Sequence, residues 1–321
     1  MDKLLATIQI DLDSLEAIQE CYGWENFPED AKNLLYEEGT TNFLDLLDHY
    51  NIKSTFFVIG KDAQDSFKKT IISEIHNRGH EIANHSFSHT IGLSKLNDNA
   101  IIKEIKSAED AIGNITGSKP KGFRSPGYDI NSRILKILED SGYEYDSSLL
   151  PSFYGSLFRF ADRFISGERS RPFPTMRDKS RTTEKKQFGR FVDGFAPLKP
   201  YQPDEKKYWH RGNTLKIVEV PITTIPIIRF PFHSTIIFKF GTPIFDMGFM
   251  LLKKYNLPIN YLFHIIDLVD TKKIKGLERL FFLKLPLEKR RALVKYIIEK
   301  IKNDYATMKT ADYVKAILNK L

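Results

Sequence analysis

Short apolar segments alternate with amphipathic segments through the first 150 residues of the chain. The β-branched and aromatic runs at 4–10 and 54–59 predict strands, whereas residues 66–77 and 99–115 carry apolar side chains at helical spacing. Strands that alternate with helices lie parallel in one sheet, so the pattern predicts an α/β fold, open or closed as a barrel. The other predicted strands are 81–84, 122–123 and 143–145, and the other predicted helices are 41–49 and 131–141.

The regular pattern stops near residue 152 and resumes at residues 215–220. Residues 152–213 are rich in Arg, Phe, Pro and Ser without a clear period, and we interpret them as a long insertion with partial order. For the apolar residues 225–252 we favour core packing of the last strands, with a lipid-contacting surface as the alternative. We predict a single domain over residues 1–321, interrupted by this insertion. The last predicted elements are a strand at 261–263 and helices at 286–303 and 309–320.

The net charge of +7 is concentrated in one segment. Residues 155–215 contain 14 Lys and Arg against 7 Asp and Glu, a local balance of +7 that equals the excess of the whole chain. Such a segment suits an anionic membrane surface, a phosphorylated substrate, nucleic acid, or a solvated surface without a partner. It carries no known nucleic-acid-binding pattern, so nucleic acid is the least favoured partner.

The N-terminal sequence MDKLLATIQIDLD has no apolar run of the kind found in secretory signals. No stretch of about 18 uncharged apolar residues predicts a membrane-spanning helix. Cys21 is the only cysteine, which excludes an intrachain disulfide. These features predict a cytoplasmic protein, with peripheral contact at the inner membrane face as an extension of that prediction.

Polar side chains suited to metal or proton chemistry stand at the carboxyl ends of five predicted strands. Sites in β/α folds are built at this edge of the sheet, because the loops that follow the strands meet there. Their common position favours one shared site over unrelated roles. The set comprises Asp11, Asp13, His85, His89, Arg124, Asp146 and His264.

Asp11 and Asp13 are two residues apart, so extended backbone places both carboxylates on one face. His85 and His89 are four residues apart, and a helical turn or a tight loop brings their imidazoles together. Two His and one Asp, with the remaining positions open to water, resemble the ligand set of a catalytic zinc site. The alternatives are a capping pair of aspartates and loop histidines bonded to their neighbours.

The remaining polar residues allow both functional and structural interpretations. The Arg124 guanidinium can orient a carboxylate, and the Pro-Gly pair that follows lets a backbone N–H approach a substrate oxygen. Asp146 could hold a histidine in one tautomer or cap a helix. A lone histidine such as His264, at the end of an apolar strand, more often has a structural role.

These motifs resemble those of the polysaccharide deacetylase, or NodB-homology, family (carbohydrate esterase family 4). Residues 79–89, GHEIANHSFSH, are similar to its second motif nearly residue for residue. Residues 123–127 resemble the third motif, 142–148 the fourth and 262–264 the fifth. Residues 54–60 resemble the first core strand after motif one. Leu12 separates the two aspartates, as in the D-x-D branch of the family.

The resemblance implies a distorted seven-stranded (β/α) barrel and a metal-dependent hydrolase that removes the N-acyl group of a sugar. It assigns one divalent ion, Zn²⁺ with Co²⁺ or Ni²⁺ as alternatives, to Asp13, His85 and His89. The other implied roles are general base for Asp11, held by Arg124; general acid for His264, oriented by Asp146; and oxyanion or substrate binding for the Gly127 N–H and Tyr128.

The implied substrate is an N-acetylated sugar in a polysaccharide or in a lipid-linked glycan precursor of the cell envelope. Leu149 stands where the family commonly has Trp, so a groove-wall aromatic is missing and a long chitin chain is disfavoured. The alternatives are deformylation of a lipid-linked formamido sugar and a catalytically silent sugar-binding module on the same fold.

Overall fold

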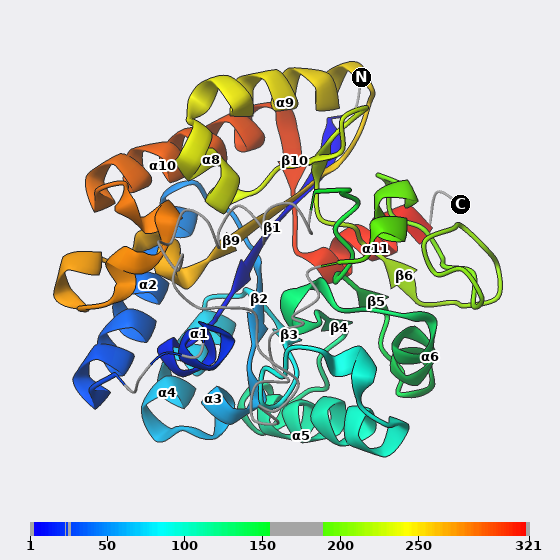
Figure 1. The fold of residues 1–321 in the computed structure, drawn as a ribbon, viewed down its shortest axis with the longest axis horizontal. Helices are drawn as coiled ribbons and strands as arrows, with labels where there is room; N and C mark the ends of the chain where they lie inside the picture. The colour runs from blue at the N-terminus through cyan, green and yellow to red at the C-terminus, as the bar shows by residue number, and fades with distance from the viewer. Residues whose placement is uncertain (1–2, 23, 25–26, 155–188, 319–321) are drawn as a thin grey trace, which may run out of the picture.

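A parallel sheet curls around a polar interior and is covered by helices on its outer face (Figure 1). The computed structural model describes residues 3–22, 24, 27–154 and 189–318. Strand β1 (Leu4–Asp11) is central, because it pairs with β2 (Thr55–Val58), β9 (Ile259–His264) and β10 (Tyr305–Thr307). The sheet continues from β2 through β3 (Glu81–Asn84), β4 (Gly122–Phe123), β5 (Tyr145–Asp146) and β6 (Val218–Glu219).

The prediction of a (β/α) barrel is confirmed in the form of a curled half-barrel, and every ladder of the described sheet is parallel. Eight strands form this sheet, one more than the seven expected. The helices that cover it are α1 (Leu15–Tyr22), α2 (Glu29–His49), α3 (Gly60–Gln64), α4 (Ser66–Asn77), α5 (Asp98–Thr116), α6 (Ser132–Asp140), α8 (Ser234–Phe240), α9 (Thr242–Lys254) and α10 (Leu287–Asp304).

Strand β1 separates an apolar outer face from a polar inner face by strict alternation. Ala6, Ile8 and Ile10 lie in the main hydrophobic core, beneath the helices. Gln9 and Asp11, on the opposite face, are equally buried. Since successive side chains of a strand point to opposite faces, the sequence TIQIDLD supplies both layers. Buried polar groups need partners, so the interior of the half-barrel is a hydrogen-bonded network.

The C-terminal helix α11 (Thr310–Leu318) fills the interior of the half-barrel from the side opposite the candidate site. Its residues Ala311 and Tyr313 pack with Phe57 and Tyr145, which point inward from β2 and β5. The Thr310 hydroxyl accepts a hydrogen bond from the Gln9 amide at 3.0 Å. The first turn of α11 thus supports one end of the polar network.

The half-barrel is bridged between β9 and the segment after β6 by the side chains of Asn260 and Thr223 and by one backbone hydrogen bond, from the Thr223 N–H to the Asn260 carbonyl at 3.2 Å. Asn260 of β9 donates to the carbonyls of Val220 and Pro221, at 3.1 and 3.2 Å. The Asn260 backbone N–H donates to the Thr223 hydroxyl at 2.7 Å. The segment after β6 and the first residues of β9 are therefore held side by side, which joins the two edges of the curled sheet.

Two sequence-based boundaries need correction. Helix α2 begins at Glu29 and not at residue 41, because Leu35 and Tyr36 extend its buried stripe. Within the predicted insertion, residues 189–213 pack on the sheet through buried Tyr201, whose backbone bridges to Glu219. Residues 155–188 lie outside the described residues.

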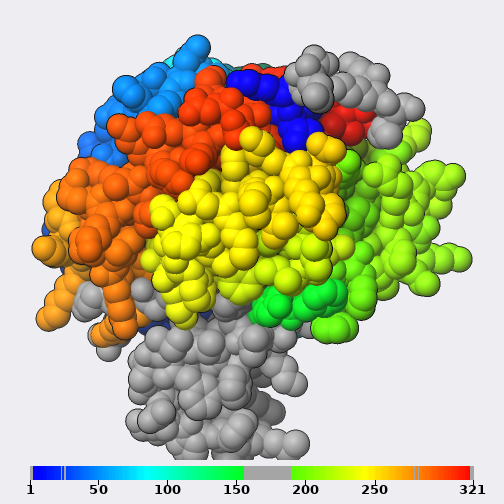
Figure 2. Space-filling view, turned by 90° about the horizontal axis from the view of Figure 1, so that it is seen from above, coloured from blue at the N-terminus to red at the C-terminus, as the bar shows by residue number. Residues whose placement is uncertain are grey.

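Residues 225–252 pack on the core, which is the alternative that the sequence favoured, but they do not form the last strands of the barrel. They form a hairpin of β7 (Thr224–Ile225) and β8 (Phe230–Pro231), followed by α8 and α9. One side of these helices is buried, and the other contributes to the surface coloured yellow in Figure 2. No helix among the described residues has the length and apolar content to cross a membrane.

Candidate active site

Asp13, His85 and His89 converge at the carboxyl edge of the sheet, beyond the ends of β1 and β3. The Nε2 atoms of both histidines lie 3.4 Å from the Asp13 Oδ1 atom. One ligand atom from each of the three residues lies within 4.8 Å of the other two. Among the described residues this is the one group of His, Cys, Asp and Glu side chains with such geometry. The predicted ligand set is brought together.

Local backbone geometry explains the convergence of the two histidines. Ser86 and His89 adopt positive φ angles of 60° and 55°, so residues 85–89 form a tight loop and not a helical turn. The Nδ1 atom of His85 lies 2.7 Å from the Arg124 carbonyl, which fixes the proton on Nδ1. The Nε2 lone pair then faces Asp13. A backbone carbonyl that accepts the Nδ1 proton commonly orients a histidine ligand toward a metal in this way.

The electrostatics of the group fit a cation. Burial alone would raise the pKa of the Asp13 carboxyl, but the imidazoles of His89 and His85 outweigh burial and hold that pKa well below its usual range. The Asp13 Oδ1 atom is buried without a conventional hydrogen-bond donor. Two imidazoles and one carboxylate suit Zn²⁺ and other divalent transition metals. The residues present therefore fit a metal ion.

Asp11 is held next to this group by a buried arginine. The Arg124 Nη1 atom donates to Asp11 Oδ1 at 2.5 Å, and both side chains are almost completely buried. Arg124 also bonds Gln9, and its Nε donates to the Ser147 carbonyl at 2.9 Å. Its guanidinium stacks 4.1 Å from the Phe57 ring centroid. These contacts fix one Asp11 oxygen and leave the other facing the site.

His264 lies directly opposite Asp11 in the ladder between β1 and β9. Its Nε2 atom lies 3.8 Å from Asp11 Oδ2, and its side chain is 20% exposed, so it reaches solvent or substrate at the mouth of the site. Asp267 accepts the His264 backbone N–H at 3.0 Å and anchors the turn after β9. Parallel register therefore places the two candidate proton-transfer groups side by side.

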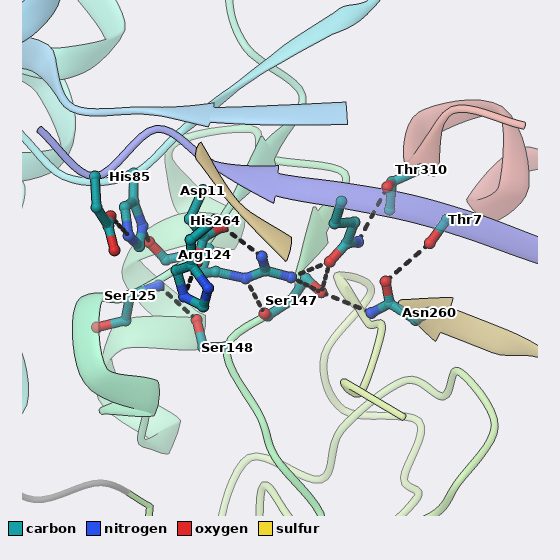
Figure 3. A network of polar contacts seen from close by, with 12 residues as sticks. Thr7, Asp11, His85, Arg124, Ser125, Ser147, Ser148, Asn260, His264 and Thr310 are labelled. Atoms are coloured by element: carbon teal, nitrogen blue, oxygen red, sulfur yellow. Dashed lines mark hydrogen bonds and ion pairs between the residues drawn. The ribbon is translucent and has the colours of Figure 1, made fainter. Parts of the chain in front are cut away.

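A chain of hydrogen bonds continues from Arg124 across the interior (Figure 3). The Ser147 hydroxyl lies 3.1 Å from an Arg124 nitrogen, and the Asn260 amide donates to the same hydroxyl at 3.1 Å. The Thr7 hydroxyl donates to Asn260 Oδ1 at 2.8 Å. Since each of these buried groups has a partner, the network can hold Arg124, and through it Asp11, in one geometry.

The predicted oxyanion segment borders the same site. Gly127 has φ 67° and ψ 22°, a left-handed conformation that glycine adopts without strain. The next residue, Tyr128, packs against Leu150, Ile222 and Leu262. Burial, and then the charge of Asp11, raise the pKa of the Tyr128 hydroxyl, so it remains a neutral donor. Tyr128 thus lies beside Asp11, next to the left-handed turn at Gly127.

Asp146 does not have the position predicted for it. Its carboxylate accepts the Ser148 N–H and hydroxyl at 3.0 and 2.7 Å and lies beside Glu219 rather than His264. The reason is strand alternation: Tyr145 and Ser147 point into the interior, so Asp146 between them points away. The role of orienting His264 is therefore not supported for Asp146.

Asp146 and Glu219 form a buried carboxyl pair instead. Burial, and then the negative charge of Asp146, raise the pKa of Glu219 well above its usual range. Glu219 Oε1 accepts the Leu149 backbone N–H at 3.1 Å. Leu149 itself is fully buried in the second hydrophobic cluster, so its side chain does not line a groove.

We expect Glu219→Gln to stabilise the protein at pH 8 by about 1–3 kcal/mol, with the gain shrinking toward pH 5. A carboxyl whose pKa is higher in the folded than in the unfolded state stabilises folding at low pH and loses that contribution as pH rises. Glutamine is neutral throughout and keeps an oxygen for Leu149. Urea unfolding at both pH values measures the effect. Glu205→Gln, at an exposed site, is the control and should change little; a Glu219→Gln protein less stable than the parent at pH 8 would contradict the assignment.

Five residues of the site were not predicted from the sequence. They are Gln9, Ser147 and Asn260, which hold Arg124, and Asp267 and His233. His233 precedes α8 and is buried. Burial, and then the positive charge of His264, lower the pKa of the His233 imidazole. One signal was available for Gln9. Central parallel strands are normally apolar on both faces, so alternating polar residues in β1 indicate a polar interior.

The fold and the site together define a (β/α) half-barrel protein with a candidate metal centre, and with Asp11 beside His264, at the carboxyl edge of its sheet. Residues 29–145 match the family described as polysaccharide deacetylase. The resemblance predicted from the motifs is thereby confirmed.

Curated relatives match only part of the chain. The peptidoglycan-N-acetylglucosamine deacetylase of Bacillus cereus is 35% identical over 106 residues, which are 33% of this chain and 38% of the relative. The peptidoglycan deacetylase of Helicobacter pylori is 25% identical over 153 residues, 46% of this chain and 50% of the relative. The chain thus spans half or less of the length of these relatives.

A solved structure shares the whole fold. The crystal structure of a Mycobacterium smegmatis protein assigned to the polysaccharide deacetylases superposes with a TM-score of 0.63. The alignment covers 100% of this chain and 92% of that chain at 16% sequence identity. At this identity the likeness shows the fold alone.

Proposed function

We propose that this protein is a metal-dependent de-N-acetylase that hydrolyses the amide of an N-acetylated sugar. The observation that carries the proposal is the convergence of two groups at one edge of the sheet. One is the ligand set Asp13, His85 and His89; the other is the Asp11–His264 pair, whose side-chain atoms lie 3.8 Å apart. A silent sugar-binding module would not need a proton acceptor and a proton donor beside a metal site.

The metal would be held by Asp13, His85 and His89, and we propose Zn²⁺, with Co²⁺ or Ni²⁺ as alternatives. A divalent ion in such a site supplies Lewis-acid polarisation of the acyl oxygen and activation of water. Its preference for the site follows from the donor atoms, because imidazole nitrogens and a carboxylate oxygen suit these ions better than Mg²⁺ or Ca²⁺.

The residues of the chain would perform the proton transfers. Asp11 would take a proton from the attacking water, since Arg124 holds its carboxylate ionised and oriented. The Gly127 N–H would donate to the oxyanion that forms when the carbonyl carbon becomes tetrahedral. His264 would donate a proton to the sugar nitrogen as the C–N bond breaks. Water and the amide thus give a free amine and acetate.

The proposed substrate is an amino sugar that is N-acetylated within a polysaccharide or a lipid-linked glycan precursor of the cell envelope. Similarity to peptidoglycan deacetylases supports a glycan substrate. The buried position of Leu149, where the family commonly has Trp, supports a site without that groove-wall aromatic. A formyl group in place of the acetyl group is the alternative, and an assay of the released acid distinguishes formate from acetate.

The test is release of acetate from water-soluble N-acetylglucosamine oligomers, with formate measured in parallel. We expect acetate release that stops when a chelator removes the metal and returns when Zn²⁺, Co²⁺ or Ni²⁺ is added back. Formate release from an N-formyl analogue, with no acetate from the acetyl compound, would redirect the proposal to deformylation. Activity that persists in the metal-free protein would refute it.

A further inference from the structure

Five large apolar side chains are exposed on neighbouring segments, and we refer to them as the apolar rim. Ile227 is 71% exposed, Phe191 68% and Phe195 58%, far above the values of core side chains. The two phenylalanines belong to a short 3-10 helix (Phe191–Phe195), and Ile227 lies in the turn between β7 and β8. Ile228 and Phe240 complete the rim.

Ring contacts and one hydrogen bond join these segments into one surface. Phe153 packs its ring against Phe191 and Phe195, with centroids 5.2 and 5.1 Å apart. Arg229, in the β7–β8 turn, donates to the carbonyl of Ala196 at 2.7 Å, next to Phe195. On the other side of the turn, the Phe230 ring lies 5.9 Å from that of Phe240 at the end of α8.

The apolar rim begins at the walls of the candidate active site. Leu150 packs in the cluster that holds Tyr128, and Phe153 of the rim contacts follows it three positions later. The β7–β8 hairpin leads directly into α8, which packs against β9, the strand that ends at His264. A surface that docks through the rim therefore meets the mouth of the site.

Charge around the rim has one sign. The segments 189–203 and 220–245 contain four cationic residues and a single acidic residue, Asp193. Asp193 is buried and accepts hydrogen bonds from the Tyr208 hydroxyl and the Arg190 N–H, so it offers no charge to a partner. The cationic residues are Arg190, Lys199, Arg229 and Lys239.

Ile227 is an unfavourable choice for its position on grounds of folding alone. Its φ is 72°, a left-handed conformation that strains a β-branched residue, and its side chain is mostly in water. Asparagine or glycine would be more stable there. A strained and exposed apolar residue at the tip of a turn indicates that something other than stability determines the residue at this position.

We propose that the apolar rim docks on an anionic lipid bilayer, so that the mouth of the site faces the membrane. On the described segments 189–203 and 220–245, exposed aromatic and isoleucine side chains are flanked by Arg and Lys, and the one acidic side chain is buried. This pattern is the complement of an anionic interface. This inference rests on the proposed function for its purpose, because it brings the site to a lipid-linked N-acetylated sugar. It also makes a binding prediction that does not depend on catalysis.

The experiment is co-sedimentation of the full chain with phosphatidylcholine vesicles that contain or lack phosphatidylglycerol. We expect binding to the anionic vesicles that weakens with salt, and at least a tenfold loss of affinity, as an order of magnitude, for the double variant Phe195→Ser with Ile227→Asn. The control is Ile102→Asn, which removes an isoleucine that is 40% exposed on α5, and it should bind as the parent does.

Two further readouts separate the possible failures. The Ile227→Asn protein should melt no lower than the parent, which shows that lost binding is not lost folding. The double variant should keep its activity on a water-soluble oligomer. If neither the parent nor the variants have activity but the parent binds vesicles, the proposed function fails and the docking surface stands. The inference is overturned if the parent does not bind vesicles, if its binding does not depend on phosphatidylglycerol, or if the double variant binds equally well. In that case a protein partner or another part of the chain would cover the rim.

Discussion

Asp11→Asn should lower turnover by about 10²- to 10⁴-fold while the purified protein keeps its full metal content, which is the range that a general base contributes. Asparagine preserves the shape of the side chain and an oxygen for the 2.5 Å hydrogen bond from Arg124, but it cannot take a proton from water. Asp11 is not in the ligand group, so the ion should remain. Initial rates of acetate release, together with metal analysis, measure both quantities.

A matched control is needed because Asp11→Asn also removes one charge of a buried ion pair, which is destabilising in itself. Asp193→Asn removes a carboxylate that is equally buried and hydrogen-bonded but lies outside the site. It should have little effect on turnover per folded molecule, which separates the loss of a buried carboxylate from the loss of the base. If Asp11→Asn retains parental turnover, the assignment of the base is wrong.

His85→Ala and His89→Ala should each lose the metal, with metal affinity falling by at least about 100-fold. Mutation of a residue that only hydrogen-bonds to a metal ligand already lowers metal affinity by about 10- to 100-fold. Each substitution removes one of three protein ligands and leaves a group of two. Metal content after purification and titration of the metal-free variants with Zn²⁺ measure the loss. Turnover should fall in parallel because the ion is required for the proposed chemistry.

His80→Ala is the control for general damage by loss of a buried histidine. His80 is 3% exposed and accepts the Ser54 backbone N–H at 3.1 Å, five residues before His85. It lies outside the ligand group and should keep the metal although its stability decreases. Parental metal affinity in both His85→Ala and His89→Ala would exclude the ligand set.

The arrangement of the site has a simple physical origin. Neighbouring strands of the curled sheet run parallel, so every strand of that sheet that ends in a polar residue delivers it to the same edge. The register between β1 and β9 then sets Asp11 beside His264, and Asn260 holds the two edges of the curled sheet together. The polar inner face of β1 provides Gln9, which with Ser147 holds Arg124.

Residue type and spacing were enough to predict the alternating strands and helices, the edge that carries the site, and the set Asp11, Asp13, His85, His89 and Arg124. These are local properties: side chains alternate along a strand, and a residue at the end of a parallel strand has only one edge to occupy. The D-x-D spacing leaves Leu12 pointing into the core and both aspartates toward the site.

Only the tertiary structure decided which side chains support that set. Asp146 and Glu219 face each other because adjacent strands pair in register, a relation between residues 73 positions apart that no local pattern contains. Gln9, Ser147 and Asn260 meet because a sheet curls and its edges approach. Exposure of Ile227 and Phe195 on one surface likewise depends on how the hairpin and the 3-10 helix pack. Contacts between distant segments follow from the closure of the fold, and a sequence by itself specifies composition and spacing but not which distant faces meet.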